Sequence, residues 1–457
     1  MTTSIQPLAR VPESLHGVAR VPSIWHADLP RATRLEPTLT RADTIVVGAG
    51  FAGLSAAYHM LERFPGSDVV VLDSEGIGAG ASARSTGMLT PGVGQNLAGL
   101  CRRVGAKAAR DMYLSTLRAV EYVAQLVQRE EIACDLHLNG QLVVARGSDG
   151  RSRLIDQART FDSLDLPYRS LTDDELDARV RLNGLTPEQR GSKQPAALFL
   201  PTAGVLNPGK LLSGLSAAVQ RRGGRVFSHA AVVEIGQNSP VTVTLANGRQ
   251  LLADRVVLAT NGYTSQLRIL AGRLLPLHLR LLVTEPLDAE QLEELGWRGR
   301  EAIIDSRKLF DYYRITEDSR IVFGGGRPQY FWHGATHERE PGSDAQKLLA
   351  DLEDTFAIRR LPRVSGSWSG LISYVLDSIP VIARWQRNPH VVHVGGWCGH
   401  GIALSLTSGQ WVADLLDARS SPATQPWFRQ KAPLLPTEIG RWLGVRLATW
   451  AMQSSRA

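Results

Sequence analysis

Short apolar runs and longer amphipathic segments alternate along this 457-residue chain, and the alternation is clearest near its amino terminus. Residues 44–47 and 69–72 are continuous apolar runs, which predict two buried strands. Residues 54–63 lie between them, have helical spacing and predict a helix. The order of strand, helix and strand favours an α/β fold with a parallel sheet.

The same alternation continues to the carboxyl-terminal end. Helical spacing predicts three long helices, at 106–129, 208–222 and 402–416. Short apolar runs predict further strands, at 225–227, 231–235, 241–245, 250–252 and 254–262. Residues 280–326 alternate between apolar and polar side chains, which predicts an antiparallel sheet. The predicted fold class is α/β: a Rossmann-like domain with a parallel sheet plus helices, and an α+β domain with an antiparallel sheet.

The length of the chain favours two domains, because single hydrophobic cores stop growing well below 457 residues. The amino-terminal residues are interrupted by prolines and contain no apolar core of signal-peptide length. The predicted boundaries are 1–40 for an irregular arm, 41–100, 200–268 and 364–420 for a nucleotide-binding domain, 101–199 and 269–363 for a substrate domain, and 421–457 for a helical tail.

A glycine turn joins the first predicted strand to the first helix. Gly48 permits the tight turn, Gly50 lets a pyrophosphate approach bare backbone, and Gly53 lets helix and strand pack closely. Asp73 ends the second strand about 20 positions later, where a carboxylate can accept both hydroxyls of an adenosine ribose. Glycine turns also occur by chance, but strand, turn, helix, strand and acid in this order predict a dinucleotide site.

Two further glycine-rich stretches are able to approach a ligand. Residues 75–87 have such small side chains that their backbone can lie against a flat or charged molecule. Ser82, Arg84 and Ser85 would donate hydrogen bonds there, with Arg84 as the charge partner of a pyrophosphate; a flexible surface loop is the alternative. Residues 391–401 form a strand and a glycine turn before a long helix, whose amino terminus favours negative charge.

Composition and charge exclude several classes of protein. The formal net charge is +7, but Lys and Arg are scattered, so we predict no nucleic-acid partner. No apolar run reaches the ~18 residues of a bilayer-spanning helix, so we predict no integral membrane segment. Cys101, Cys134 and Cys398 lack metal or disulfide spacing, which predicts no metal site and a reducing, cytoplasmic setting. A basic amphipathic helix at 437–453 either docks on its own domain or touches a membrane surface. The oligomeric state stays open.

Seven segments occur in a fixed order along the chain. They are GAGFAG with Asp73, GIGAGASARSTG, VVLATNGYT, TEPL at 284–287, DYYRITEDSRIVFGGG, WSG followed by an aspartate and a proline, and GWCGHGIALSLTSGQWVADLL. As an ordered set, they resemble the flavin-dependent amine and D-amino-acid oxidase superfamily, and within it the γ-glutamylputrescine oxidase-like branch. Many flavoproteins share single segments, whereas the ordered set is specific.

This resemblance implies a Rossmann-like FAD-binding domain that holds FAD without a covalent bond. The isoalloxazine would run toward the turn at 399–401. A nicotinamide cofactor is the alternative, but the second glycine-rich loop and the late turn favour the longer flavin dinucleotide. Cys398 is the one candidate for covalent attachment, and packing is its favoured role. The implied cofactor-binding residues are Gly48, Ala49, Gly50, Phe51, Ala52, Gly53, Asp73, Ser74, Gly80, Ser82, Arg84, Ser85, Gly87, Val232, Thr260, Gly399, His400 and Gly401.

The resemblance also implies removal of a hydride equivalent from a carbon that bears an amine, followed by imine hydrolysis and hydrogen peroxide formation. The partners would be a small amine and molecular oxygen or another electron acceptor. His400 would help to stabilise negative charge on reduced flavin, and a structural role in the turn is equally open. Tyr312, Tyr313 and Trp397 are candidate pocket walls, with core packing as the alternative for each. The candidate catalytic residues are His400, Tyr313 and Arg327.

Two departures from the superfamily's pattern bear on the reaction. Oxidases of free α-amino acids carry an arginine shortly after WxG that binds the substrate carboxylate, and Ile372 holds that position here. The loss favours an amine or a γ-glutamyl-type substrate, unless another arginine substitutes: Arg280, Arg314 or Arg327. Lys308 does not match the register of the oxygen-activating lysine of the sarcosine oxidase branch. An amino-acid dehydrogenase coupled to a quinone or carrier, or a flavin-bearing subunit of a complex, therefore stays open.

Overall fold

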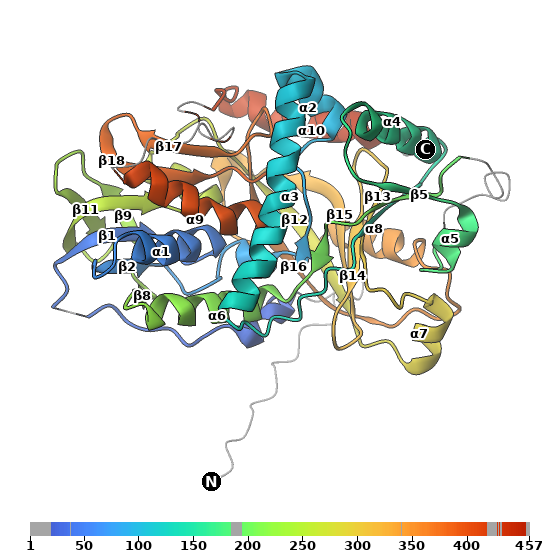
Figure 1. The fold of residues 1–457 in the computed structure, drawn as a ribbon, viewed down its shortest axis with the longest axis horizontal. Helices are drawn as coiled ribbons and strands as arrows, with labels where there is room; N and C mark the ends of the chain where they lie inside the picture. Colours follow the sequence, from blue (N-terminus) through green and yellow to red (C-terminus); the bar gives the residue numbers. More distant parts are fainter. Residues whose placement is uncertain are drawn as a thin grey trace, which may run out of the picture.

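The computed structural model describes residues 20–36, 38–183, 194–339, 341–417, 427, 429 and 432–453. Figure 1 shows two large sheets that lie side by side along the long axis of the molecule. Helices from distant parts of the chain cover the first sheet, and the long helix α3 (Ala106–Arg129) runs between the two sheets. The predicted α/β fold class is confirmed.

The first sheet has eight strands: β1 (Arg41–Val47), β2 (Val69–Leu72), β8 (Arg225–Phe227), β9 (Val232–Ile235), β10 (Val241–Leu245), β11 (Gln250–Leu258), β17 (Val381–Trp385) and β18 (Asn388–Gly395). Their order is β17-β18-β11-β1-β2-β8, and β10 and β9 continue antiparallel from β11. β1 pairs in parallel with β2 and β11, and β11 pairs in parallel with β18. Helices and segments from later in the chain cover this sheet. The residues of β1 and β2 are therefore mostly buried and apolar.

Three helices lie over one face of this sheet: α1 (Phe51–Arg63), α6 (Pro208–Arg221) and α9 (Ile402–Leu416). With α3 they form one apolar core. α1 and α9 approach closely because Gly409 has no side chain: a Cβ there would lie 2.3 Å from the main-chain oxygen of Ser55. The two helices that begin at the two predicted ligand turns are thus packed as one unit.

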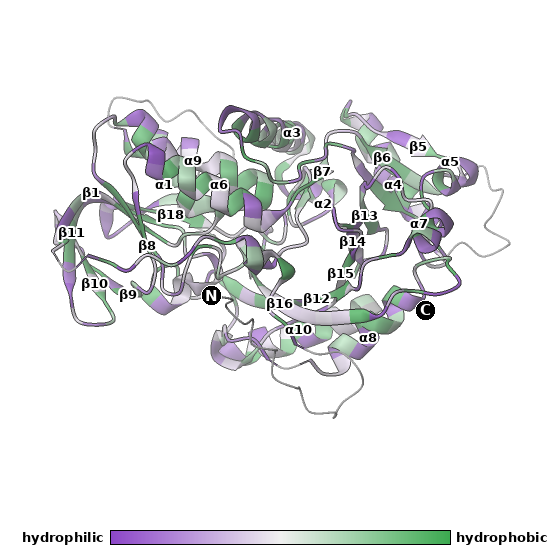
Figure 2. Cartoon of the chain, turned by 90° about the horizontal axis from the view of Figure 1, so that it is seen from below, coloured by the Kyte–Doolittle hydropathy of each residue, from purple (hydrophilic) through white to green (hydrophobic). Residues whose placement is uncertain are grey.

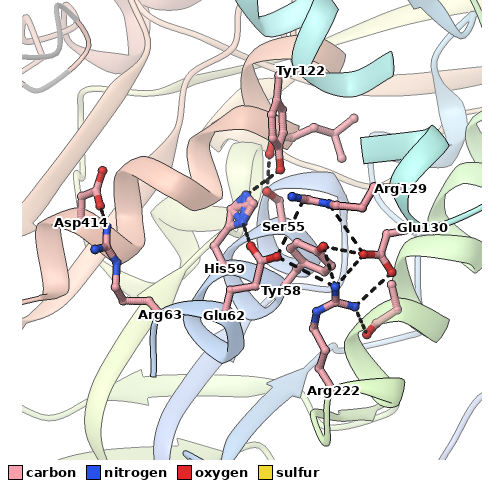
Figure 3. A network of polar contacts seen from close by, with 12 residues as sticks. Ser55, Tyr58, His59, Glu62, Arg63, Tyr122, Arg129, Glu130, Arg222 and Asp414 are labelled. Carbon is pink, nitrogen blue, oxygen red and sulfur yellow. Dashed lines mark hydrogen bonds and ion pairs between the residues drawn. The ribbon is translucent and has the colours of Figure 1, made fainter. Parts of the chain in front are cut away.

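A polar network ties α1 to α3 and α6 (Figure 3). The Tyr122 hydroxyl lies 2.7 Å from Nε2 of His59. Arg222 donates to Glu130 at 2.6 Å and to the Tyr58 hydroxyl at 2.8 Å. Burial, helped by nearby arginines, lowers the pKa of His59 to about 3. Desolvation raises the pKa of Glu130, but hydrogen bonds from Arg222 and Tyr58 outweigh it and lower that pKa to about 2.

The second sheet is mainly antiparallel, in the order β16-β12-β15-β14-β13-β4-β6-β5. Its strands are β4 (Gln141–Val144), β5 (Arg169–Leu171), β6 (Ala197–Leu200), β12 (Leu275–Thr284), β13 (Ala302–Asp305), β14 (Tyr312–Ile315), β15 (Ile321–Gln329) and β16 (Val364–Tyr374). The remaining named elements are the two-stranded sheet of β3 (Met88–Leu89) and β7 (Gly204–Val205), helices α2 (Leu97–Val104), α4 (Gly150–Ser163), α5 (Asp173–Asp177), α7 (Ala289–Leu295), α8 (Ser343–Glu353) and α10 (Glu438–Gln453), and the 3-10 turns η1 (Ile24–Asp28), η2 (Ser82–Arg84), η3 (Asn261–Leu267) and η4 (Trp332–Gly334).

The two faces of the second sheet bury different side chains, because successive residues of a strand point to opposite sides. Leu281, Val322 and Trp368 belong to the same core as the helices α1, α3, α6 and α9 of the first domain, the part of the chain around the first sheet. Leu282 and Phe323 join a separate core under α8. One face of the second sheet is therefore turned toward the first domain, and the other is covered by α8.

Most predicted elements are confirmed, and five have the predicted bounds: 69–72, 106–129, 225–227, 241–245 and 402–416. The first helix begins at Phe51, three residues earlier than predicted, and the separate strands predicted at 250–252 and 254–262 form the single strand β11. β16, which we placed with the nucleotide-binding domain, pairs with β12 in the second sheet. The domain division remains a prediction.

The described part of the amino-terminal arm packs on the body of the protein. Trp25 is 4% exposed, and its indole nitrogen donates to the main-chain oxygen of Ser85 at 2.8 Å. Residues 1–19 of the predicted arm and residues 421–426 of the predicted tail lie outside the described residues. No helix in the part that is described is long and apolar enough to cross a membrane.

Candidate functional site

Three parallel strands end at one edge of the first sheet, and each runs into a segment that holds predicted cofactor-binding residues. β1 leads to Gly48, β11 leads to Ala259 and Thr260, and β18 leads to residues 396–401. The carboxyl ends of adjacent parallel strands meet, so segments far apart in the chain become neighbours. A Cβ at Gly48 would lie 2.7 Å from the main-chain oxygen of Ala259.

The turn after β1 has the geometry of a phosphate cradle. Gly48 has φ +106°, and a Cβ at Gly53 would lie 1.8 Å from the main-chain oxygen of Gly48. α1 starts after Gly50 without a side-chain cap. The Phe51 amide donates to Ser82 Oγ at 3.0 Å, so the loop at 75–87 lies against this helix end. A bare, close-packed helix amino terminus of this kind binds anions.

The Asp73 carboxylate is held beside this turn by main-chain amides. Ala49 donates to Oδ2 at 2.8 Å, and Glu75 and Gly76 each donate to Oδ1 at 3.0 Å. An ionised carboxylate has further lone pairs, so these three hydrogen bonds fix its orientation and still leave it able to accept from a ligand. Its place at the end of β2 is the one expected for a carboxylate that binds an adenosine ribose.

The structure gives Arg84, in the loop at 75–87, partners within the protein. Arg84 forms an ion pair with Glu338 at 2.6 Å and donates to the main-chain oxygens of Ala79 and Ser369, each at 3.1 Å. Part of its guanidinium is thus engaged by the protein, and its contact with a pyrophosphate stays a prediction. A local sequence signal could not reveal Glu338, which lies far along the chain.

Other predicted cofactor residues lie around the same edge. Ser82 and Ser85 are half-buried within the loop, and Ser74 is exposed at its start. Thr260 Oγ1 lies 2.8 Å from Thr264 Oγ1 just after β11. The remaining predicted positions comprise buried residues of the first turn of α1, two loop glycines and the first residue of β9: Ala52, Gly53, Gly80, Gly87 and Val232. Their roles stay predictions.

The turn before α9 is open on one side. Gly399 is exposed, has φ +87°, and has no atom within 4 Å of an added Cβ, although its neighbours Trp397 and Cys398 are buried. Gly401, the N-cap of α9, makes no side-chain cap. Nδ1 of His400 is buried and has no hydrogen-bond partner within the described residues. Burial lowers the pKa of His400, which favours a neutral imidazole with one donor and one acceptor nitrogen.

Strand alternation corrects the predicted role of Tyr313. Its ring is 2% exposed and stacks on Phe323 at 5.2 Å in the core under α8, so core packing is its role and the catalytic prediction is wrong. Tyr312 points the other way, toward the first domain, where a Cβ at Gly324 would lie 2.3 Å from its ring. Of the two tyrosines, Tyr312 is the one placed to contact a ligand between the domains.

Arg327 also lies away from the glycine turns. It is exposed and lines a small cavity with His278, Arg280 and Asp344. Because Asp344 lies on α8 and pairs with Arg280, this cavity is on the α8 side of the second sheet. The prediction that Arg327 is catalytic is therefore not supported by its position.

Cys398 has the surroundings of a packing residue. Its thiol is 7% exposed and accepts a hydrogen bond from the Val375 amide at 3.3 Å. Burial raises its pKa to about 12. The thiolate is the nucleophilic form of cysteine, so this thiol is poorly suited to attack a flavin.

These features fit FAD. A phosphate cradle follows β1, and a carboxylate placed to bind a ribose follows β2. An open turn with an unpartnered imidazole nitrogen lies between β18 and α9. The sequence pattern of the DAO family of FAD dependent oxidoreductases matches residues 43–415. The chain belongs to this family, and it is an FAD-dependent oxidoreductase.

Several known proteins are similar to this chain. The gamma-glutamylputrescine oxidoreductase of Escherichia coli is 29% identical over 377 residues, which cover 82% of this chain and 83% of that protein. A probable oxidoreductase, OrdL, of Haemophilus influenzae is 26% identical and covers similar shares, 83% and 84%. The crystal structure of glycine oxidase from Geobacillus kaustophilus has a TM-score of 0.69 at 18% identity, over 85% of this chain and 98% of that one. The last comparison shows a shared fold.

We predict that acid precipitation of the purified protein releases its yellow colour into the supernatant. The reason is that Cys398 is buried with a raised pKa, and no covalent anchor was apparent elsewhere in the sequence. The measurement is the flavin absorbance of supernatant and pellet. Colour that stays in the pellet of the wild type, but not of a Cys398→Ala variant, would contradict the non-covalent assignment.

Proposed function

We propose that this protein oxidises the C–N bond of an amine that is not a free α-amino acid, with a γ-glutamylated diamine as the preferred type of substrate. The observation that carries the proposal is Ile372. By the family resemblance, Ile372 matches the position of the carboxylate-binding arginine, and in the structure it packs against an apolar cluster that contains Leu277 and Tyr330. A substrate carboxylate would find no charge partner there.

The three arginines that could replace the missing one support the same proposal. Arg280 is paired with Asp344 on the α8 side of the second sheet. Arg314 faces the first domain but is 2% exposed and donates to the main-chain oxygens of Leu206 and Gly87. Arg327 lines the cavity beside Arg280. The similarity to the E. coli gamma-glutamylputrescine oxidoreductase agrees with an amine substrate.

Bound FAD would supply the hydride acceptor, and the protein would supply binding, orientation and electrostatics. The α1 turn and Asp73 would hold the adenosine half. The uncapped start of α9 would stabilise negative charge near the open turn, and neutral His400 would add one hydrogen bond. Tyr312 would form part of the wall between the domains.

The remaining possibilities differ in the molecule that accepts the electrons of the reduced flavin. We propose molecular oxygen, with imine hydrolysis to an aldehyde and hydrogen peroxide as the second product. Lys308 is exposed on the segment before β14, which gives no support to an oxygen-activating lysine at that position. A dehydrogenase that passes electrons to a quinone or carrier, or an electron-transfer subunit, is therefore the second candidate. A cytoplasmic location remains an expectation from the cysteine content.

The test measures flavin reduction without oxygen, and peroxide release with oxygen, for a panel of polyamines, γ-glutamyl amines, N-methyl amino acids and D-amino acids. We expect kcat/KM for the best γ-glutamyl amine to exceed that for any D-amino acid by at least about 100-fold, because only the amino acid brings its carboxylate next to the reacting carbon, where it would lack a charge partner. Reduction only by D-amino acids would overturn the substrate proposal. Reduction without peroxide would favour the dehydrogenase.

An Arg327→Gln variant provides the matched control. Its side chain lies on the far side of the second sheet, so kcat/KM should stay within about two-fold of the wild type. A loss of more than about tenfold, seen only with substrates that carry a carboxylate, would show that Arg327 binds substrate.

A further inference from the structure

The outward side of α10 is apolar. Ile439, Leu443, Leu447 and Trp450 recur at helical spacing and are 62%, 45%, 62% and 65% exposed. Leu434, just before the helix, is 67% exposed. With Trp332, which contacts Trp442 of α10, they make up six of the eleven large hydrophobic side chains exposed among the described residues. The exposed apolar surface of this protein is thus concentrated in one place.

The docking of α10 does not explain this surface. The inward side of the helix holds it in place: Trp442 and Val445 pack with Leu275 and Leu277. Glu438 accepts hydrogen bonds from the Tyr330 hydroxyl at 2.9 Å. Figure 2 shows α10 at the outside of the molecule, beyond the strands β12 and β16. The outward side chains stay 45% to 65% exposed in the docked helix, and proteins in water rarely leave so many together on the surface.

Large and small side chains form two adjacent stripes on this outward side. Gly440, Gly444, Ala448 and Ala451 recur at nearly the same spacing as the large residues and lie next to them on the helix surface. A Cβ at Gly444 would meet no atom within 4 Å, whereas one at Gly440 would lie 2.8 Å from the Cβ of Pro436. The small stripe is therefore a shallow, open groove from Gly444 onward, where Ala448 and Ala451 are also exposed. A ridge beside such a groove is complementary to a copy of itself.

We propose that two copies of this chain associate through α10, with the ridge of each helix in the groove of the other. A two-fold axis parallel to the helices produces this match, because it brings unlike stripes opposite each other at the same level. Such an interface is isologous and closed. Small residues let the helix axes approach closely, and the ridge residues of both copies lose contact with water.

The charges on α10 favour a second copy over a lipid surface. Arg446 is the one charged side chain exposed on this helix within the described residues, and it stacks on Trp442 at 3.8 Å. Helices that bind anionic membranes draw on several cations along their polar side. Here the other two charged residues of the helix, Glu438 and Arg441, lie on its half-buried side and pair with each other.

The length of the stripe sets the expected strength. From Ile439 to Trp450 the helix rises by about 16 Å, so the buried area is at the small end of specific interfaces. We therefore expect a reversible dimer that dissociates in the micromolar range.

Sedimentation velocity of the full-length, FAD-loaded protein between about 1 and 100 µM tests the proposal. The mass is expected to rise with concentration from 49.8 kDa toward twice that value. Leu447→Glu should remain a monomer with unchanged FAD content. Val233→Glu is the matched control: Val233 is 51% exposed on β9, in the other domain, and its variant should dimerise as the wild type does.

A second variant tests the groove itself. Gly444→Leu keeps the surface apolar and improves helix propensity, but it fills the groove, so it should also prevent dimerisation. A monomeric wild type, or a Leu447→Glu dimer, would overturn the proposal. So would a monomeric wild type that co-sediments with phosphatidylglycerol–phosphatidylcholine vesicles and loses this binding in Leu447→Glu, since that result assigns the surface to lipid.

Discussion

A Gly53→Ala variant should retain less than about a tenth of the FAD that the wild type carries. The added Cβ would lie 1.8 Å from the main-chain oxygen of Gly48 and 2.9 Å from its carbon, and neither atom can rotate away. The helix α1 must shift from the strand, which moves its amino terminus out of place for a pyrophosphate. Overpacking of this kind also costs about 1–3 kcal/mol of stability. The measurement is the ratio of flavin to protein absorbance after purification.

Gly342→Ala controls for the change from glycine to alanine. A Cβ at Gly342 would have an ordinary contact of 3.5 Å with the Asp344 side chain, so FAD content should be unchanged. Thermal unfolding of both variants without FAD separates a damaged cofactor site from a damaged fold. A Gly53→Ala protein with full FAD content would show that the α1 turn does not hold the cofactor.

Acid is expected to destabilise the protein well above the range in which carboxylates titrate. His59 and His393 are 3% and 2% exposed, and burial lowers the pKa of each to about 3. In the unfolded chain both would titrate near 6.5, so the unfolded state takes up protons first as the pH falls. The stabilisation is complete above pH 6.5 and is lost progressively toward pH 3. Between pH 7 and pH 5, each histidine should remove about 2 kcal/mol from the free energy of unfolding.

Urea unfolding at several pH values measures this slope. His59→Gln keeps a polar side chain for the Tyr122 hydroxyl and should reduce the acid loss between pH 7 and pH 5 by about 2 kcal/mol, the share of His59. His390→Gln is the control, since His390 is exposed and its variant should keep the slope of the wild type. A wild-type stability that does not change between pH 7 and pH 5 would contradict the assignment of both buried histidines as neutral.

The sequence was most informative where structure follows from local signals. Buried strands, helix periods and glycine turns depend on neighbouring residues, so β2, α3 and α9 were predicted with their observed bounds. The glycine turns after β1 and β18 were found in this way too, whereas the strand predicted at 254–262 ran through the turn that follows β11. Their meeting at one edge then follows from parallel pairing, which the repeated order of strand, turn and helix already favours.

The failures concern partners and faces, which depend on the whole fold. The ion pair of Arg84 with Glu338 was not predicted, because Glu338 lies far away in the sequence. Tyr312 and Tyr313 are neighbours with the same strand propensity. Only the register of the strand determines which of them faces the first domain. We placed β16 with the nucleotide-binding domain, because an apolar strand fits either sheet. Its pairing with β12 shows that it belongs to the second sheet.

The order of the strands also constrains how the protein is made. The central strand β1 pairs with β11, whose residues are synthesised more than two hundred positions later, and β11 pairs in turn with β18 near the end of the chain. On the ribosome, β1 and β2 therefore wait as apolar segments with an unpaired edge, which makes them targets for chaperones and for aggregation. The turn before α9, which we expect to meet the flavin ring, is translated later still, so a complete cofactor site would form only after most of the chain has been made.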